Sequence, residues 1–411
     1  MWGRVALGAA AATAVCSLAG CGGDQAPAAG HAPIGGKGPH GASTGSASGG
    51  GTQPQGPPQD FEPEAISSFD SYEGRWPQTF FGDGPRDFLA LGDRLAYSYD
   101  TADVGITAYR LDTGEVAWHT TVPDGDGVEQ APHLVGTAVM GVFGTSTEGT
   151  GTSAGHHAVV VAAYDAATGE ELWTRDVVEG EGTGAPRAHI VGATDERVLV
   201  SAEDGSSALV DMRTGRLVWT DSDFEGLDLE ETVAVGTRDD GQFVGKSTSD
   251  GRQLWKRQAL VGEALPGDPG PGLTLANGIG VGDSLLLDPV TGKTSLDMKD
   301  GADDCHYDGW TTTVCSGTDG SGSATVTAVD LQNARVLWRL PDEAANRVAP
   351  TVTSAWHGLV YAEADAPMTL DARTGKDLRV NISLAPSMVN DRYGLVYDDT
   401  RSVIDVYRAK G

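Results

Sequence analysis

Short apolar runs alternate with polar turns along most of the chain. Runs such as RLAYSYD (94–100), HHAVVVAAY (156–164), RVLVSAE (197–203) and HGLVYAE (357–363) are separated by Gly, Asp, Ser and Pro. The region after the N-terminus shows no convincing long run of apolar residues at helical spacing. Short β-type runs bounded by turn residues are typical of strands. The pattern therefore predicts an all-β fold with many tight turns.

One pattern recurs seven times: an apolar run, a turn with Asp, Thr and Gly, and a second short run. The copies are AYRLDTGEVAW (108–118), AYDAATGEELW (163–173), LVDMRTGRLVW (209–219), GKSTSDGRQLW (245–255), LLDPVTGKTSL (286–296), AVDLQNARVLW (328–338) and TLDARTGKDLR (369–379). Asp bonds forward to its own backbone in such turns, and Gly accepts their positive φ. After a longer first interval, the copies follow each other every 36 to 46 residues. This is the period expected of propeller blades.

Five of the copies carry a tryptophan four residues after the glycine position, namely Trp118, Trp173, Trp219, Trp255 and Trp338. A tryptophan repeated at one strand position indicates packing between neighbouring blades, not five separate binding sites. The fifth and seventh copies have Leu296 and Arg379 at that position. We therefore expect weaker contacts after those two blades.

The repeats predict a β-propeller over residues 62–411, with eight four-stranded blades. Seven blades is the alternative if region 88–112 is irregular. The last stretch, YGLVYDDTRSVIDVYRAKG (393–411), supplies two strands and stops before an outer one. An N-terminal strand that completes the last blade would leave no open sheet edge there. We expect this strand to be GRWPQTFF (74–81), with Trp76 as its packing tryptophan.

The N-terminus has the features of an export signal. Residues 1–20 combine Arg4 with an alanine-rich apolar segment that is too short for a comfortable membrane span. They end in Leu-Ala-Gly before Cys21, which resembles the lipobox of bacterial lipoproteins. That resemblance implies diacylation of Cys21, cleavage before it, and location on the outer side of the cell membrane. Residues 21–61 are rich in Gly, Pro and Ser, which predicts a disordered tether.

Cys305 and Cys315 are the two cysteines that remain for the folded part. An even pair in an exported protein usually forms a disulfide, so we expect one here, pinning a long inter-strand loop. Nearby Trp310 and Tyr307 are candidates for contact with a partner, with blade packing as the alternative role of Trp310. The other loops expected to carry contacts are 122–132 and 144–157, because loops on a rigid scaffold often carry function.

The repeat resembles that of the PQQ-type β-propellers. Its consensus, (A/V)-(Y/V)-D-x-x-T-G-x-x-x-W, covers residues 64 to 411. That superfamily includes quinoprotein alcohol dehydrogenases, the propeller lipoprotein of the outer-membrane assembly machine and some kinase sensor domains. For a dehydrogenase the resemblance implies a vicinal Cys–Cys disulfide, a tryptophan floor, calcium and a catalytic Asp. The chain has no adjacent cysteines, so we expect no PQQ cofactor and no catalytic residues.

Other chemical motifs are incomplete. GTSAG (151–155) fits G-x-S-x-G but lies in a Gly/Thr/Ser-rich run with no helix to follow. TGKT (291–294) lacks the first glycine of a phosphate loop. DSDFEGLDLEET (221–232) approaches a calcium loop, but it has Thr at position twelve and no helical flanks. We predict no metal site, and leave calcium at 221–232 as an open alternative.

Charge narrows the choice of partner. The formal net charge is −30, and the acidic residues are spread along the folded part. Such a surface repels phosphate backbones, which argues against nucleic acid. The sequence therefore predicts a lipid-anchored, non-enzymatic scaffold or sensor that binds an envelope or secreted protein. The alternatives are a propeller that binds a small ligand or cell-wall glycan in its central funnel, and a PQQ-dependent dehydrogenase.

Overall fold

The computed structural model describes residues 56–70, 88–100, 104–122, 125–126, 131–147, 149, 152, 155–179, 187–238, 240–258, 269–277 and 284–410. The chain divides into two units, Met1–Thr52 and Gln53–Gly411, and every described residue lies in the second. Within those ranges, no helix has the length and apolar character needed to cross a bilayer. The predicted signal peptide, Cys21 and most of the predicted tether lie outside the described residues.

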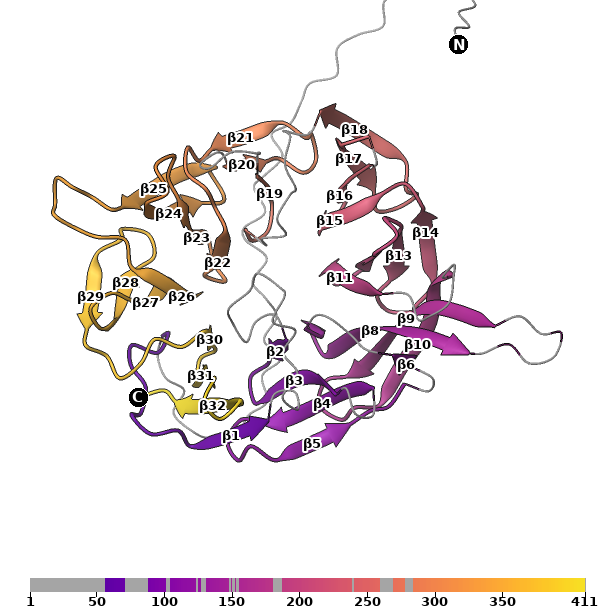
Figure 1. The fold of residues 1–411 in the computed structure, drawn as a ribbon, viewed down its shortest axis with the longest axis horizontal. Coiled ribbons are helices and arrows are strands. Elements are labelled where there is room, and N and C mark those ends of the chain that lie inside the picture. Colours follow the sequence, from indigo (N-terminus) through magenta and orange to yellow (C-terminus); the bar gives the residue numbers. More distant parts are fainter. Residues whose placement is uncertain are drawn as a thin grey trace, which may run out of the picture. The chain divides into compact units, whose positions relative to one another are not determined.

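The described strands of the second unit form eight antiparallel sheets arranged in a ring (Figure 1). The prediction of an all-β, eight-bladed propeller is confirmed. Six of the sheets have four strands. Blade 2 has a fifth short strand, and blade 5 has three strands within the described residues.

The strands of blades 1 to 4 follow each other from the inside of the ring to its rim. Blade 1 consists of β2 (Leu89–Leu91), β3 (Leu95–Asp100), β4 (Gly105–Arg110) and β5 (Val116–His119). Blade 2 consists of β6 (Gly125–Asp126), β7 (His133–Val135), β8 (Ala138–Thr147), β9 (His156–Asp165) and β10 (Glu171–Glu179). Blade 3 consists of β11 (Ala188–Ala193), β12 (Arg197–Ala202), β13 (Ser207–Asp211) and β14 (Leu217–Asp221). Blade 4 consists of β15 (Glu225–Leu229), β16 (Val233–Thr237), β17 (Gln242–Ser247) and β18 (Gln253–Gln258).

Blades 5 to 8 continue the ring, and blade 8 takes its outer strand from the N-terminal side. Blade 5 consists of β19 (Thr274–Asn277), β20 (Ser284–Leu287) and β21 (Thr294–Asp297). Blade 6 consists of β22 (Asp304–Tyr307), β23 (Thr312–Thr318), β24 (Ala324–Asp330) and β25 (Arg335–Leu340). Blade 7 consists of β26 (Thr351–Trp356), β27 (Leu359–Glu363), β28 (Pro367–Asp371) and β29 (Asp377–Val380). Blade 8 consists of β30 (Met388–Val389), β31 (Tyr393–Asp398), β32 (Val403–Arg408) and β1 (Ser67–Asp70).

The hydrophobic core lies between the blades. The two middle strands of each blade are buried on both faces, as β9 and β13 show. The largest core cluster joins Met140, Val161 and Trp173 of blade 2 to Val198 and Val210 of blade 3. Each blade therefore depends on its neighbours for burial, as expected of a repeat architecture.

The repeated turn positions the outer strand of each blade. In blade 2, Asp165 Oδ1 accepts hydrogen bonds from the backbone N–H and the hydroxyl of Thr168, both at 2.9 Å. The N–H of Gly169 donates to the Asp165 carbonyl at 2.8 Å. Past the turn, the pairing shifts by one residue between Glu171 and Trp173. Equivalent shifts occur in the outer hairpins of the other six repeats. A β-bulge bends its strand and redirects side chains, and here it accompanies a tryptophan turned towards the next blade.

Each of the five repeated tryptophans lies on the turn glycine of the following blade. Trp118 covers Gly169, and Trp173, Trp219, Trp255 and Trp338 cover the glycines of the next turns, namely Gly215, Gly251, Gly292 and Gly375. A Cβ at any of these glycines would approach the indole to less than 3.0 Å. Four of the indoles also donate their N–H to a carbonyl of that turn, for example Trp173 to Met212 at 2.9 Å. The fifth indole, that of Trp219, instead has the ammonium of Lys246 at 5.1 Å from the centroid of its ring.

In the two repeats that lack the tryptophan, in blades 5 and 7, the next turn also lacks the glycine. Leu296 of blade 5 precedes Ala334 of blade 6, and Arg379 of blade 7 precedes Ser402 in the blade 8 turn. Ala334 and Ser402 keep the left-handed backbone, with φ of 44° and 55°. The turn shape alone therefore does not require glycine here. The indole of the preceding blade does, because it takes the space of a Cβ.

The ring closes with β1, which pairs with β32 from Ser67 opposite Val406 to Asp70 opposite Val403. The prediction of a closing N-terminal strand is confirmed, but its assignment to 74–81 was wrong. Phe69 is buried between blades 8 and 1 and stacks on Tyr109 of blade 1, with ring centroids 4.5 Å apart. An alternating segment with one buried aromatic residue thus fills the outer position without a tryptophan. Trp76 and the segment 74–81 lie outside the described residues.

Asp60 and its hydrogen-bond partners, which we call the polar latch, hold the closing segment in place. Asp60 accepts hydrogen bonds from Lys410 Nζ at 2.8 Å and from the backbone N–H of Ser383 at 2.9 Å. Burial by itself would raise the pKa of Asp60, but these bonds and that of Phe61 N–H outweigh burial and lower the pKa from 3.8 to about 2. Because the folded pKa is the lower one, the latch stabilises the fold above pH 3.8 and is lost as pH falls towards 2.

We expect Asp60→Asn to lower the free energy of unfolding by about 1–2 kcal/mol at neutral pH. The difference from the unsubstituted protein should shrink to nothing near pH 2, where Asp60 is itself half protonated or more. Urea unfolding at both pH values measures this. Asp112→Asn, at an exposed turn residue of blade 1, is the matched control. An equal loss at both pH values would mean that the carboxylate charge plays no part.

Candidate binding site on blades 6 to 8

Trp310 is held on a rigid turn between β22 and β23. Asp308 is buried, and its Oδ1 accepts hydrogen bonds at 2.9 Å from the backbone N–H groups of Trp310, Thr311 and Thr312. The hydroxyl of Tyr307 donates to the Trp310 carbonyl at 2.8 Å. These bonds fix the backbone of Trp310, while its side chain remains 57% exposed. An exposed indole on an ordered backbone loses little conformational entropy when it binds a partner.

Two residues of blade 7 continue from Trp310 into a stack of three rings. The centroid of the His357 ring lies 4.9 Å from that of Trp310, with an interplanar angle of 8°. It lies 4.0 Å from the ring centroid of Trp356, with an angle of 26°. We call Trp310, His357 and Trp356 the aromatic stack. His357 has φ of 45°, a conformation that few non-glycine residues adopt. The backbone N–H of His357 donates a hydrogen bond to the backbone carbonyl of Asp308 at 2.6 Å, and this bond links blades 6 and 7.

Blade 8 and the neighbouring turns complete the site. Asp391, in the turn between β30 and β31, accepts a hydrogen bond from Trp356 Nε1 at 2.9 Å and lies 3.3 Å from His357 Nδ1. Arg373, in the outer turn of blade 7, donates to the Thr311 hydroxyl at 3.0 Å and lies 3.8 Å from Asp330. Three consecutive blades therefore hold one aromatic surface in place.

Asp330 keeps a negative charge beneath this surface. Burial by itself would raise its pKa, but hydrogen bonds from Asn333 and Arg335 outweigh burial and hold the pKa below the ordinary value of 3.8. A charged Asp330 attracts Arg373 and so supports the turn that carries Trp310. The arrangement is that of a preformed binding surface.

The structure brings Trp310 and Tyr307, which the sequence analysis predicted as contact residues, next to other residues that it did not predict. Trp356, His357 and Asp391 were missed. A signal for Trp356 was present, because both it and Trp310 lie outside the repeated tryptophan position. His357 and Asp391 carry no such signal, since their role depends on neighbouring blades meeting in space.

Cys305 and Cys315 form a disulfide in the same blade. They are directly paired residues of β22 and β23, so the bond joins two adjacent strands of a hairpin, not the ends of a long loop. Both side chains are buried in the cluster between blades 5 and 6, together with Leu273, Met298 and Leu331. The bond therefore supports a blade interface at which the repeat lacks its tryptophan.

The residues of the remaining candidate motifs either form contacts within the fold or lie only partly within the described residues. Asp221 forms ion pairs with the buried Lys246 and with Arg238, which also pairs with Asp223 at 2.6 Å. Cations thus neutralise both acidic residues that suggested calcium at 221–232. TGKT (291–294) spans the end of the blade 5 turn and the start of β21. The described residues contain no cluster of three or more His, Cys, Asp or Glu placed to hold a metal ion.

The other two loops expected to make contacts are only partly described. Both ends of 144–157 are strand, since β8 ends at Thr147 and β9 begins at His156. Ser153, within that segment, and most of 122–132 lie outside the described residues.

Comparison with known proteins finds similarity over part of the chain. Residues 156–303 match a family model described as outer membrane protein assembly factor BamB. Over 186 residues the chain is 27% identical to the protein of that name from Burkholderia pseudomallei strain K96243. That match covers 39% of this chain and 43% of the relative, so it spans less than half of the relative's length.

Two solved structures are similar to the chain at low sequence identity. BamB from Moraxella catarrhalis is 16% identical with a TM-score of 0.48, over 78% of this chain and 95% of that chain. A quinohemoprotein alcohol dehydrogenase from Pseudomonas putida HK5 is 14% identical with a TM-score of 0.44, over 84% and 76%. The chain is an eight-bladed β-propeller, and its residues 156–303 are similar to the assembly-factor family model.

Proposed function

We propose that the chain is a lipid-anchored, extracytoplasmic scaffold that binds an envelope or secreted protein and has no enzymatic activity of its own. The observation that carries the proposal is the aromatic stack, in which an exposed Trp310 is fixed by hydrogen bonds and ring contacts from blades 6, 7 and 8. Tryptophans held in this way are frequent energetic centres of protein interfaces.

The comparisons support a partner that is a protein. The family model and the curated relative both carry the name of an outer membrane protein assembly factor. The lipobox-like sequence before Cys21 supports attachment of the propeller to a membrane on the outer side of the cell. A diacylated Cys21 followed by the Gly/Pro/Ser-rich segment would give the propeller reach while keeping it at the membrane surface.

The test uses the full chain in its source cells, with a photo-reactive phenylalanine analogue at the exposed Arg392, next to Asp391. We expect one protein to be cross-linked reproducibly and identified by mass spectrometry from the membrane fraction. Trp310→Ala should weaken binding of that protein at least tenfold, because truncating a central tryptophan costs about 2 kcal/mol or more. Val116→Ala, at a similarly exposed side chain of blade 1, is the matched control.

Two outcomes would count against this function. If Trp310→Ala and Val116→Ala bind the cross-linked protein equally well, the aromatic stack is not the contact surface. If calorimetry shows a cell-wall glycan binding the purified protein and Trp310→Ala abolishes its heat, the ligand is a sugar. Cys21→Ser provides the check on anchoring, because it should move the protein out of the membrane fraction.

A further inference from the structure

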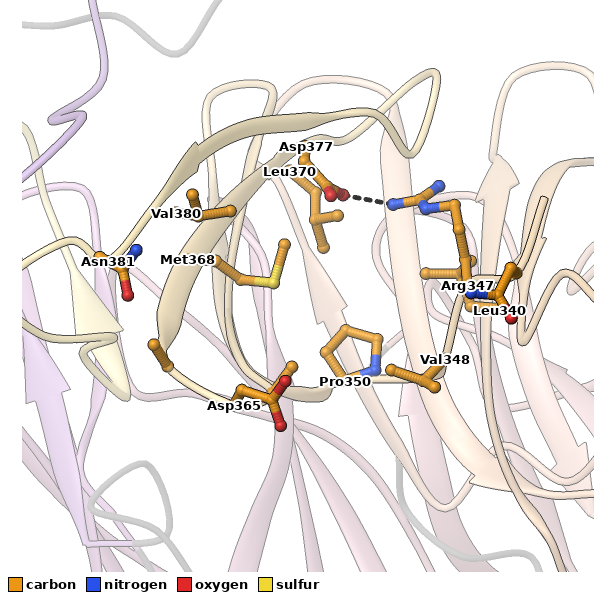
Figure 2. A pocket seen from close by; sticks show the side chains of 13 residues that line it. Leu340, Arg347, Val348, Pro350, Asp365, Met368, Leu370, Asp377, Val380 and Asn381 are labelled. Atoms are coloured by element: carbon orange, nitrogen blue, oxygen red, sulfur yellow. Dashed lines mark hydrogen bonds and ion pairs between the residues drawn. The ribbon is translucent and has the colours of Figure 1, made fainter.

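A second surface lies at the opposite end of blade 7 from the aromatic stack. It is a groove of about 360 Å³, lined by the β25–β26 connection, the β27–β28 turn and the end of β29 (Figure 2). The aromatic stack involves the β26–β27 turn. Successive turns of an antiparallel sheet alternate between its two ends, so the groove and the stack are on opposite faces of the propeller.

The groove has an apolar floor and apolar sides. Leu340, Met368 and Leu370 form a buried floor. Val348 and Val380 border it, at 70% and 60% exposure. These two valines are the most exposed large apolar side chains among the described residues. Their coincidence at one groove indicates a surface that a partner covers.

Val380 occupies a strand position that faces solvent throughout the repeat. Its counterparts after the repeated tryptophans, such as Thr174, Thr220 and Lys256, are exposed as well, but they are polar. All four residues of β29 are exposed. Blade 7 therefore places an apolar side chain at a solvent-facing position, beside the groove.

The charge around the groove is negative. Arg347 is the cation in its lining, and an ion pair with Asp377 already neutralises it, as Figure 2 shows. Asp365 lines the groove and forms no ion pair within the described part of the chain, and the nearby Glu363 is also exposed. A ligand would therefore meet apolar side chains first and uncompensated carboxylates at the edge.

We propose that this groove binds a short peptide segment of a partner protein, in which an apolar side chain stands next to lysine or arginine. The apolar side chain would fill the space between Val348 and Val380, and the cation would face Asp365. The volume accommodates a few side chains and not a folded domain. An anionic lipid or a sugar fits less well, because the floor is apolar and the border acidic.

The probe is a fluorescein-labelled dodecapeptide of alternating leucine and lysine, and fluorescence anisotropy at physiological salt measures its binding to the purified full chain. We expect saturable binding that weakens at least fivefold in Val380→Ser and in Asp365→Lys. Val290→Ser is the control for the first, because Val290 has similar exposure on blade 5. Glu170→Lys, in the blade 2 turn, is the control for Asp365→Lys, because it changes the net charge by the same amount.

Two further peptides define the chemistry. Replacing every lysine by glutamate, or every leucine by serine, should remove measurable binding. Trp310→Ala should leave binding of the leucine–lysine peptide unchanged, because the aromatic stack is on the other face. Equal affinity for Asp365→Lys and Glu170→Lys would mean attraction to net charge alone and would overturn the proposal. Equal binding of the glutamate peptide, or an absence of saturation, would overturn it as well.

Discussion

Replacing Trp173 by alanine is expected to lower the free energy of unfolding by about 3–5 kcal/mol. Trp173 is the most deeply buried of the repeated tryptophans and belongs to the core cluster between blades 2 and 3. The substitution removes its packing on Gly215 and leaves the Met212 carbonyl without its indole donor. Both losses act at the interface on which the two blades depend, so the cost includes a cavity and an unpaired polar group.

Urea unfolding followed by tyrosine and tryptophan fluorescence measures the change. Leu172→Ala is the control, because Leu172 is adjacent, 52% exposed, and lies at the bulge that precedes Trp173. It should change the free energy of unfolding by about 0.5 kcal/mol or less. Similar losses for Leu172→Ala and Trp173→Ala would contradict the role assigned to the repeated tryptophan.

Removing the disulfide is expected to cost about 2–3 kcal/mol, as the double variant Cys305→Ala, Cys315→Ala. In the chain-entropy account this follows from the ten-residue separation of the two cysteines. The effect should concentrate in blades 5 and 6, because both cysteines are part of the cluster between them. That interface has Leu296 and Ala334 in place of the tryptophan–glycine pair, so it has less packing to replace the bond.

Thermal unfolding with and without reductant tests this prediction. Reductant should lower the midpoint of the unsubstituted protein towards that of the double variant, and should leave the variant itself unchanged. Hydrogen exchange should show faster opening of β22 and β23 in the variant, with β12 and β13 of blade 3 as the internal reference. Uniform acceleration across all blades would contradict a local role for the bond.

Much of the fold could be predicted because each blade repeats the same short sequence pattern, which determines local structure. The Asp-x-x-Thr-Gly turn uses hydrogen bonds within a few residues, as Asp165 and Thr168 show. The period of the repeat then gives the number of blades. The two repeats without a tryptophan were visible as well, since Leu296 and Arg379 interrupt an otherwise regular series.

Contacts between distant segments could not be predicted in the same way. The sequence indicated that an N-terminal strand closes the ring, yet both 67–70 and 74–81 can form a strand. The structure selects Ser67–Asp70, because Phe69 reaches Tyr109 and Asp60 reaches Lys410. These partners are far apart in the chain, and no local pattern connects them.

By itself, the sequence determined the class of fold, the repeated turns and the tryptophans that join one blade to the next, because those features depend on residues close together in the chain. Tertiary structure decided which strand closes the ring, that His357 and Asp391 support Trp310, and that Val348 and Val380 border one groove. The physical reason is that binding surfaces on a propeller arise where separate loops meet, and only the closed ring brings those loops together.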